Sequence, residues 1–170
     1  MRLWHYGLLP YLSDKAITTQ WGELNTIMSK KGKVDNLIVN YVYNYEPREL
    51  LKYAGLVILE LKTRNILIYN YAVVIQYFAD NYEEDFGEYG DVDDIINDII
   101  YEAKDWVTLG NKLFKDHHTQ LYLLQCFFNL QEKFNRGAKD LNLDIMEKLT
   151  IFITSKFENM SLYDAIMFLK

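Results

Sequence analysis

The chain has 170 residues, enough for one domain with a substantial core, and half of them are hydrophobic. It contains only 2 Pro and 8 Gly residues, which disfavours a β-sandwich with many turns and favours long helices. No apolar run is long enough to span a bilayer, and the start lacks the basic-then-apolar order of a signal peptide. The single cysteine, Cys126, excludes an internal disulfide and fits a reducing cytoplasm. Its neighbours are mostly apolar, so we expect a buried, inert thiol. We expect no membrane partner.

Charge is distributed unevenly along the chain, whose net charge is −6. Residues 1–79 and 106–170 carry net charges of +3 and +1, whereas residues 80–105 carry −10. The chain is therefore mildly basic except for one acidic block. This asymmetry affects any interaction with nucleic acid, because clustered carboxylates repel a phosphate backbone.

The first half of the chain predicts two helices with clear ends. Ser13 is placed to cap a helix over residues 14–28, in which apolar residues recur at helical spacing. Residues 37–45 favour a strand by propensity, but without partner strands we interpret them as an extended connector or a short helix. Pro47 suits the first turn of a second helix that ends at residues 64–65.

The second half predicts further helices. Residues 66–82 are apolar and rich in Tyr, which predicts a helix, with a strand as the alternative. Asp91 is placed to cap a strongly periodic helix that Gly110 ends. The remaining expected helices cover residues 118–134 and 141–157, with a short one after Ser161.

These elements predict an all-α fold, a compact single-domain helical bundle. The first five residues include Arg, Trp and His, so we expect an extended N-terminal segment that packs against the helices instead of fraying. We expect residues 1–137 to form the main helical domain, with an acidic insertion at about 80–105. Residues 138–170 are expected to add a C-terminal helical extension packed on the same domain.

Candidate functional residues occur near the start of the chain and near residue 118. Arg2, His5, Gln20 and Glu23 come first, and an adjacent pair of histidines follows at 117–118. Two histidines are too few for a zinc site, which usually needs three or four ligands at recognisable spacing, so we expect no metal. No phosphate-binding glycine pattern or nucleophile motif is present. The residues alone therefore indicate a compact helical domain and leave its chemistry open.

Five short motifs have an order and spacing that are fairly specific when taken together. They are M-R-L-W-H at residues 1–5, L-L-P-Y-L at 8–12, Q-W-G-E at 20–23, V-N-Y-V at 39–42 and H-x-x-x-Y-L-x-x-C-x-x-N-L at 118–130. This pattern resembles the pyrimidine-dimer DNA glycosylase family, in its bacterial and phage branch with an M-R-L-W-H start. The resemblance covers roughly residues 1–64 and 114–134.

The resemblance implies a DNA repair enzyme that combines DNA glycosylase and abasic-site (AP) lyase activities, without a metal or cofactor. In that chemistry the chain's own α-amine, here that of Met1, attacks the sugar carbon and forms a Schiff base. An α-amine has a pKa of about 8, so a useful fraction is neutral and nucleophilic near pH 7. Glu23 matches the neighbouring carboxylate, which directs protons and stabilises the positive states.

DNA is the partner that the resemblance implies, in a distorted form with one nucleotide extruded. Arg2 is expected to contact the DNA backbone or to orient Glu23. The other residues expected at the DNA-binding surface stand at positions of the same motifs; they are His5, Gln20, Trp21 and His118, and the resemblance assigns no role to the last.

Simpler interpretations of these residues also remain open. Trp4 and Trp21 suit core aromatic positions as well as base stacking. His118, near a predicted helix start, also suits a cap or a buried polar residue with its hydrogen bonds satisfied.

Three features depart from the family's usual pattern. Gly22 stands where an Arg is usual beside the catalytic carboxylate, which removes a phosphate-binding cation. Met1 is followed by the bulky Arg2, which should prevent removal of Met1, so the reactive amine would be that of Met1 itself. The acidic block at 80–105 repels DNA unless it faces away from the site.

A second hypothesis is a catalytically degenerate relative that acts as a phage-encoded inhibitor of the DNA-mimic type. The acidic block interleaves carboxylates with aromatic residues, and such a surface can imitate a phosphate backbone and bind a basic nucleic-acid-processing protein. Its predicted partner-binding residues are Asp91, Asp93, Asp94 and Asp98. A third hypothesis is a structural module whose carboxylates provide only solubility. The expected location is the cytoplasm of a bacterial or phage-infected cell.

Overall fold

The computed structural model describes residues 2–30, 32–82 and 91–157, and every regular element within these ranges is helical. The predicted all-α class is therefore confirmed. In chain order, with η for a 3-10 helix, the described elements are η1 (Tyr6–Tyr11), α1 (Asp14–Met28), η2 (Asn40–Asn44), α2 (Pro47–Thr63), α3 (Ala72–Asn81), α5 (Val92–Thr108), α6 (Gln120–Asn135) and α7 (Leu143–Phe157).

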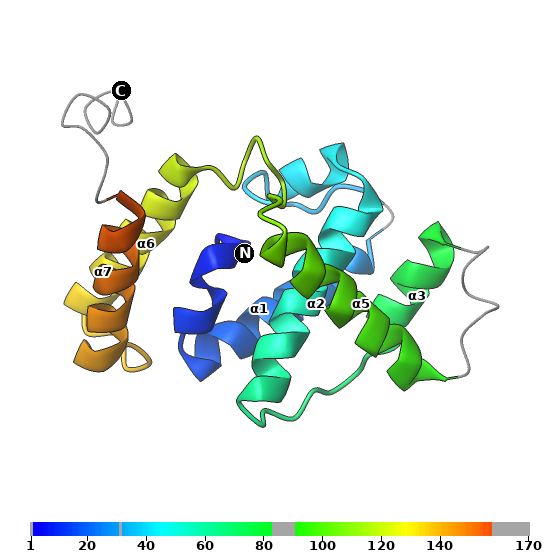
Figure 1. Cartoon of the computed structure of the whole chain (residues 1–170), viewed down its shortest axis with the longest axis horizontal. Helices are drawn as coiled ribbons and strands as arrows, with labels where there is room; N and C mark the ends of the chain where they lie inside the picture. The colour runs from blue at the N-terminus through cyan, green and yellow to red at the C-terminus, as the bar shows by residue number, and fades with distance from the viewer. Residues whose placement is uncertain (1, 31, 83–90, 158–170) are drawn as a thin grey trace.

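Helix α2 lies at the centre of the bundle. It packs against α1, α5 and η1. Helices α6 and α7 pack on each other and form the left-hand side of the molecule in Figure 1. Gly55 allows α2 to approach α5 closely, because a Cβ atom at this position would lie 2.6 Å from the carbonyl oxygen of Ile99.

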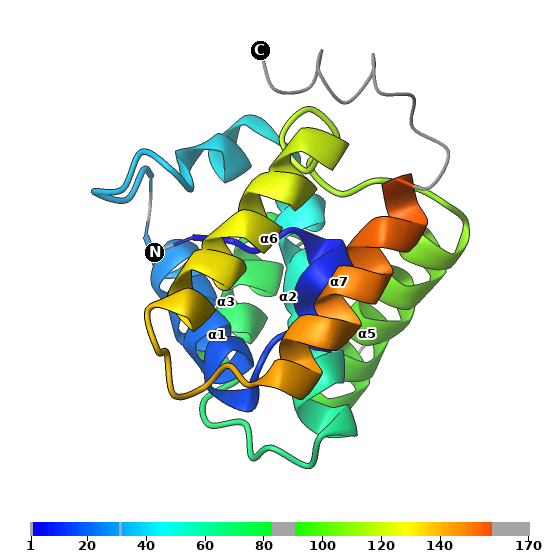
Figure 2. The same cartoon turned by 90° about the vertical axis from the view of Figure 1, so that its left-hand side faces the viewer.

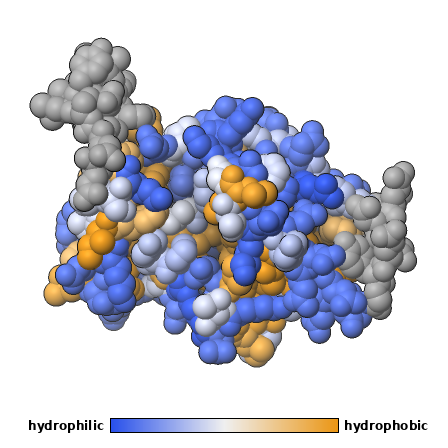
Figure 3. Space-filling view, in the orientation of Figure 1, coloured by the Kyte–Doolittle hydropathy of each residue, from blue (hydrophilic) through white to orange (hydrophobic). Residues whose placement is uncertain are grey.

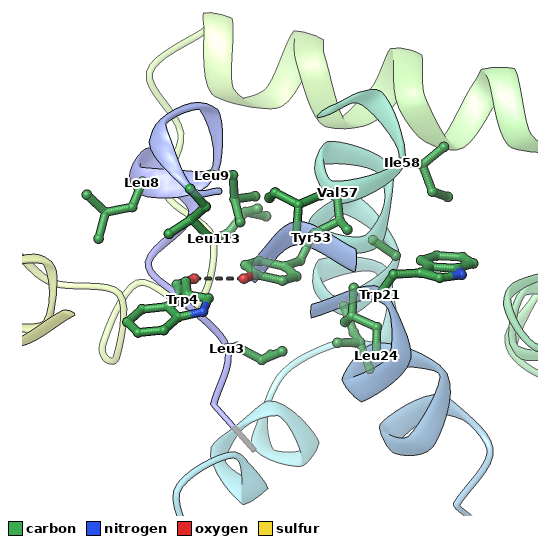
Figure 4. Close-up of a cluster of buried hydrophobic side chains, with 14 of the residues drawn as sticks. Leu3, Trp4, Leu8, Leu9, Trp21, Leu24, Tyr53, Val57, Ile58 and Leu113 are labelled. Atoms are coloured by element: carbon green, nitrogen blue, oxygen red, sulfur yellow. Dashed lines mark hydrogen bonds between the residues drawn. The ribbon is translucent and has the colours of Figure 1, made fainter. Parts of the chain in front are cut away.

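The N-terminal segment passes between these two groups of helices (Figures 1 and 2). Its side chains enter the core, where Leu3, Leu8 and Leu9 are almost completely buried and Trp4 is 7% exposed. Figure 4 shows Leu9 close to Tyr53 and Val57 of α2, whereas the Trp4 ring and the Leu8 side chain point away from α2. Each buried leucine contributes about 1.5–3 kcal/mol relative to an exposed one. The predicted packing of an extended N-terminal segment against the helices is thus confirmed.

Several helix ends follow the capping residues in the sequence. Ser13 accepts a hydrogen bond from a first-turn amide at 3.2 Å, and α1 covers Asp14–Met28 as expected. Asp91 caps α5 in the same way at 3.0 Å, and Gly110 follows that helix with a left-handed φ of +79°. Within the predicted connector at 37–45, the described structure forms the short helix η2.

Three helices begin later than the sequence predicts. One is α7, which starts at Leu143 after Asn142, whose side chain accepts a hydrogen bond from the Ile145 amide at 2.9 Å. The other two are α3 and α6. Helix α3 starts at Ala72 instead of near residue 66, because Asn70 has a left-handed φ of +67° and its side-chain oxygen accepts a hydrogen bond from the Ala72 amide. Helix α6 starts at Gln120, because Thr119 supplies the cap and His118 lies before the helix. In all three places a local polar contact overrides the apolar pattern.

The C-terminal part of the described chain packs on the rest through α7. This helix contacts α6 and η1, and Phe152 stacks on Tyr11 at a ring-centroid distance of 4.7 Å. The predicted division at residue 137 stays a prediction, and the short helix predicted after Ser161 lies outside the described residues. No helix in the described ranges is long and apolar enough to cross a membrane. The face seen in Figure 3 is mostly hydrophilic, with apolar residues in separate patches.

Candidate active site

Two backbone amides attach the start of the chain to helix α1. The Trp4 amide donates to Gln20 Oε1 at 3.0 Å, and the Arg2 amide donates to Glu23 Oε2 at 3.3 Å. Gln20 and Glu23 are three residues apart, so their side chains lie on the same face of α1. The two acceptors are therefore spaced to bind alternate residues of an extended segment.

Two tyrosines hold the same segment from other helices. Tyr53 on α2 donates its hydroxyl to the Trp4 carbonyl at 2.8 Å (Figure 4), and Tyr122 on α6 donates to the Leu3 carbonyl. Burial raises the pKa of both hydroxyls, so each keeps the proton that it donates. Residues 2–4 are thereby held between α1, α2 and α6.

Glu23 is held in one orientation. Its Oε2 atom accepts hydrogen bonds from the Arg2 amide and, at 3.2 Å, from the Gln20 side-chain amide. Gln20 is itself buried, its Oε1 atom accepts from the Trp4 amide, and the same atom lies 3.2 Å from the Tyr53 hydroxyl oxygen. Because Oε1 is the acceptor, the Gln20 nitrogen faces the carboxylate as a donor.

An open cleft of about 620 Å³ adjoins Glu23, between the N-terminal segment, α1 and α6. The Trp4 ring lies at its edge, with the Arg2 guanidinium 5.8 Å and the Lys133 ammonium 5.1 Å from the ring centroid. Three cations and two carboxylates line the cleft: Arg2, Lys15, Lys133, Glu23 and Asp140. A cationic cleft with one oriented carboxylate suits an anionic substrate whose reaction develops positive charge or moves a proton.

The comparison with known proteins points to the same part of the chain. Residues 1–72 match the pyrimidine dimer DNA glycosylase family. The matched range contains Arg2, Gln20 and Glu23, so the match supports the family predicted from the opening motifs and a glycosylase-like function on DNA. No curated protein and no solved structure matches the chain.

The two histidines that the glycosylase motifs include lie side by side in the interior. His5 Nε2 is 3.1 Å from the His118 carbonyl oxygen and therefore carries the proton, while His5 Nδ1 accepts from the Gly7 amide. His118 Nδ1 accepts from the Tyr6 amide, so its Nε2 donates to the Tyr41 hydroxyl at 2.7 Å. Burial lowers the pKa of His5 to about 4 and that of His118 well below its usual value, so both rings are neutral.

The predicted DNA-binding residues thus occupy different environments. Arg2 lines the cleft, whereas the side chains of His5, Gln20 and His118 are buried and hydrogen-bonded within the protein. Trp21 is also buried, with its Nε1 atom donating to the Tyr69 carbonyl at 3.2 Å. In the described structure these four residues position the segment and its helices, and their direct contact with DNA stays a prediction. Met1, the predicted nucleophile, lies outside the described residues.

Sequence reasoning missed several residues that line the cleft. Lys15 is eight residues before Glu23, which places both on one face of α1, so helical spacing could have identified it. Lys133 and Asp140 come from α6 and the connection after it, and no local pattern links them to the start of the chain. Only the packing of α6 against the N-terminal segment brings them to the site.

Gly22 departs from the glycosylase pattern without a steric reason. It is exposed on α1, and a Cβ atom built there meets no atom within 4 Å. A side chain can therefore start at this position without a clash at its Cβ atom.

The predicted partner-binding aspartates are all exposed at the start of α5: Asp91, Asp93, Asp94 and Asp98. The two faces of α1 show where these aspartates lie relative to the cleft. Trp21 and Glu23 point to opposite faces of α1, because two residues correspond to about 200° of helix rotation. Trp21 packs edge-on against Tyr71, whose pKa is raised by burial and by the charge of Asp93. The start of α5 therefore lies on the side of α1 away from the cleft, in agreement with Figure 1. The part of the acidic block at 83–90 lies outside the described residues.

Cys126 is buried, as predicted, and burial raises the pKa of its thiol. Among the described residues no group of three or more His, Cys, Asp and Glu side chains is arranged to hold a metal ion.

Proposed function

We propose that this chain is a DNA glycosylase and abasic-site lyase of the pyrimidine-dimer type, with the Met1 α-amine as nucleophile and Glu23 as its proton-transfer partner. The observation that carries the proposal is the hydrogen bond from the Arg2 amide to Glu23 Oε2. The α-amine is three covalent bonds from the Arg2 nitrogen, so connectivity alone keeps these two atoms within about 4 Å. A carboxylate that binds the Arg2 amide is therefore within reach of the amine.

The proposed reaction starts when the neutral amine attacks C1′ of the damaged nucleotide. A C–N bond forms, and the bond from C1′ to the base breaks, with the electron pair and a proton going to the base. Opening of the sugar ring gives a protonated Schiff base, whose charge the Glu23 carboxylate stabilises. Glu23 then accepts the C2′ proton as the bond to the 3′ phosphate oxygen breaks, and water hydrolyses the imine and releases the amine.

The cleft supplies the electrostatic attraction that DNA binding needs. Arg2, Lys15 and Lys133 line it and can pair with phosphates on either side of the extruded nucleotide. Each neutralised phosphate makes the dependence of log affinity on log salt steeper by about 0.9. The acidic start of α5 lies on another side, so it does not cancel this local attraction.

Replacing Glu23 with Gln tests the assignment. The Glu23→Gln variant keeps the side chain's volume and an accepting oxygen but loses the charge and the proton-accepting ability. We expect strand scission at a dimer or an abasic site to fall by about 10²–10⁴, with DNA binding within about threefold of the unaltered chain. Glu147→Gln, at an exposed site on α7, is the matched control. Full scission by Glu23→Gln would remove Glu23 from the mechanism.

A second candidate function is the DNA-mimic inhibitor, supported by the exposure of the four aspartates on α5 and by the missing cation at Gly22. Its partner would be a basic protein that processes nucleic acid. Retention on a heparin column separates the two candidates, because an enzyme with a cationic cleft binds the resin and a mimic passes through.

A further inference from the structure

We propose that Leu37 and Ile38 form an apolar wedge that inserts between base pairs of the bound DNA and unstacks the step beside the target nucleotide. This inference rests on the proposed function. Leu37 is 90% exposed and Ile38 is 54% exposed, so two large apolar side chains adjoin each other at the surface. Leaving such a side chain in water costs about 1.5–3 kcal/mol relative to burying it.

The loop that presents these side chains is fixed by hydrogen bonds. Asn40 accepts from the Val34 amide and donates to the Val34 carbonyl, both at 3.0 Å, which closes the loop. Asn36 Oδ1 accepts from the Ile38 amide at 3.1 Å, and Val34 and Val39 are buried on either side of the exposed pair. A loop already fixed in this way loses little conformational entropy when it enters a duplex.

The loop is continuous with the candidate active site. Ile38 lines the same cleft as Arg2, Glu23 and Lys133. In Figure 2 the light-blue loop projects beyond the neighbouring helices, on the side where the N-terminal segment starts. Exposed Lys33 lies close to it along the chain. Cations on both flanks can hold phosphates while the apolar tip faces the bases.

This chemistry matches what extrusion of a nucleotide requires. Unstacking a base step costs a few kcal/mol, and proteins that kink DNA offset this cost by inserting apolar side chains such as Leu and Ile. Filling the gap also keeps the extruded nucleotide from returning to the stack, which leaves its C1′ atom accessible to the amine. The partner of this apolar surface is therefore a bound DNA duplex.

The test uses a duplex with a tetrahydrofuran abasic analogue, which cannot form a Schiff base, and 2-aminopurine as the adjoining base. We expect the unaltered chain to raise 2-aminopurine fluorescence on binding. Leu37→Ala with Ile38→Ala should lose most of that rise and bind about tenfold more weakly, with the salt dependence unchanged. The matched control is Leu67→Ala with Leu109→Ala, because both leucines are about as exposed but lie outside the cleft lining. Leu37→Phe, which keeps the apolar bulk, should retain the rise.

The outcomes separate the wedge from the proposed function. If the unaltered chain binds the duplex and the double alanine variant gives the same fluorescence and affinity, the wedge is overturned and the function stands. An equal loss in the Leu67 and Leu109 control, or a change only in self-association, also overturns it. If the unaltered chain neither binds this duplex nor cleaves a true abasic site, the function and the wedge fall together.

Discussion

Carboxylates occur in two contrasting environments in this molecule. Glu23 is half-buried, accepts hydrogen bonds from two fixed donors and shares its cleft with three cations. The aspartates at the start of α5 are exposed, and Asp91 is bonded to an amide of its own helix. At 0.1 M salt the Debye length is about 10 Å, so exposed charges on different sides of a domain act separately. The net charge of −6 therefore says little about the field at the cleft.

Acidification should destabilise the fold that holds the cleft, because the N-terminal segment is held by hydrogen bonds of the buried neutral rings of His5 and His118. The pKa of His5 is lowered to about 4, and that of His118 lies well below its usual value. In the unfolded chain both rings take up protons at about pH 6.5. The contribution of the two neutral rings to the free energy of unfolding is complete above that pH and is lost as the pH falls toward 4. We expect the free energy of unfolding to fall by about 1.4 kcal/mol per pH unit for each histidine.

Urea unfolding at several pH values between 7.5 and about 5 measures this slope. His118→Gln should reduce the slope by roughly half, because one of the two buried rings is then absent. Equal slopes in the unaltered chain and His118→Gln would contradict the buried neutral state.

Removing the cations of the cleft should weaken DNA binding without changing the fold. Lys15→Gln combined with Lys133→Gln should lower the salt-dependence slope by about 2 and the affinity by about tenfold or more. Fluorescence anisotropy with a labelled duplex between about 50 and 200 mM salt measures both. Lys62→Gln with Lys104→Gln, at exposed sites outside the cleft lining, should change neither quantity. A similar loss in both pairs would mean that DNA does not bind at the cleft.

A cation introduced beside Glu23 should increase the difference in charge between the cleft and the acidic start of α5. Gly22→Arg should raise the salt-dependence slope by about 1, because position 22 is exposed, a Cβ atom there meets no other atom, and Glu23 is the next residue. It should also stabilise the protein by up to about 1 kcal/mol, since Gly is unfavourable inside a helix. Gly22→Gln is the control that gains the stability but not the steeper slope. A decrease in DNA affinity for Gly22→Arg would place the DNA elsewhere.

Neutralising the acidic surface should have the smallest effect on DNA. We expect Asp91→Asn, Asp93→Asn, Asp94→Asn and Asp98→Asn together to change DNA affinity by less than about threefold at 0.1 M salt. Asn at position 91 keeps the helix cap, so the fold is retained. Anisotropy with the same duplex is the measurement. An increase of tenfold or more would show that α5 lies on the path of the DNA, and loss of binding to a basic protein would support the inhibitor hypothesis.

The local features of the fold could be predicted from the sequence. Ser13 and Asp91 cap α1 and α5 where the pattern placed them, because a cap needs only a short polar side chain and a few amides near it. Asn70 was missed as a helix-start signal because an apolar run with β-branched residues hid its left-handed turn. The error in α3 is therefore one of local backbone geometry.

The site could be predicted only in part. Glu23 and Arg2 were identified as site residues from motifs near the start of the chain. Their contact requires only that the N-terminal segment lie alongside α1. Lys133 reaches Trp4 from α6, a contact between segments more than a hundred residues apart that no pattern in one sequence specifies. His5 and His118 were expected at the DNA-binding surface because of their motif positions, with a buried, hydrogen-bonded His118 as the alternative. Their hydrogen bonds to backbone groups and to Tyr41 make burial of both rings favourable.

The most direct test of the central claim is borohydride trapping on a duplex with an abasic site, read as a covalent protein–DNA band on a denaturing gel. The native chain should give a band. A chain with two residues added before Met1 should lose the band while keeping its fold and all its lysines, because its amine is moved away from Glu23. A native chain that folds and binds the abasic duplex but gives no band, or an extended chain that traps equally well, would contradict Schiff-base chemistry at the N-terminal amine.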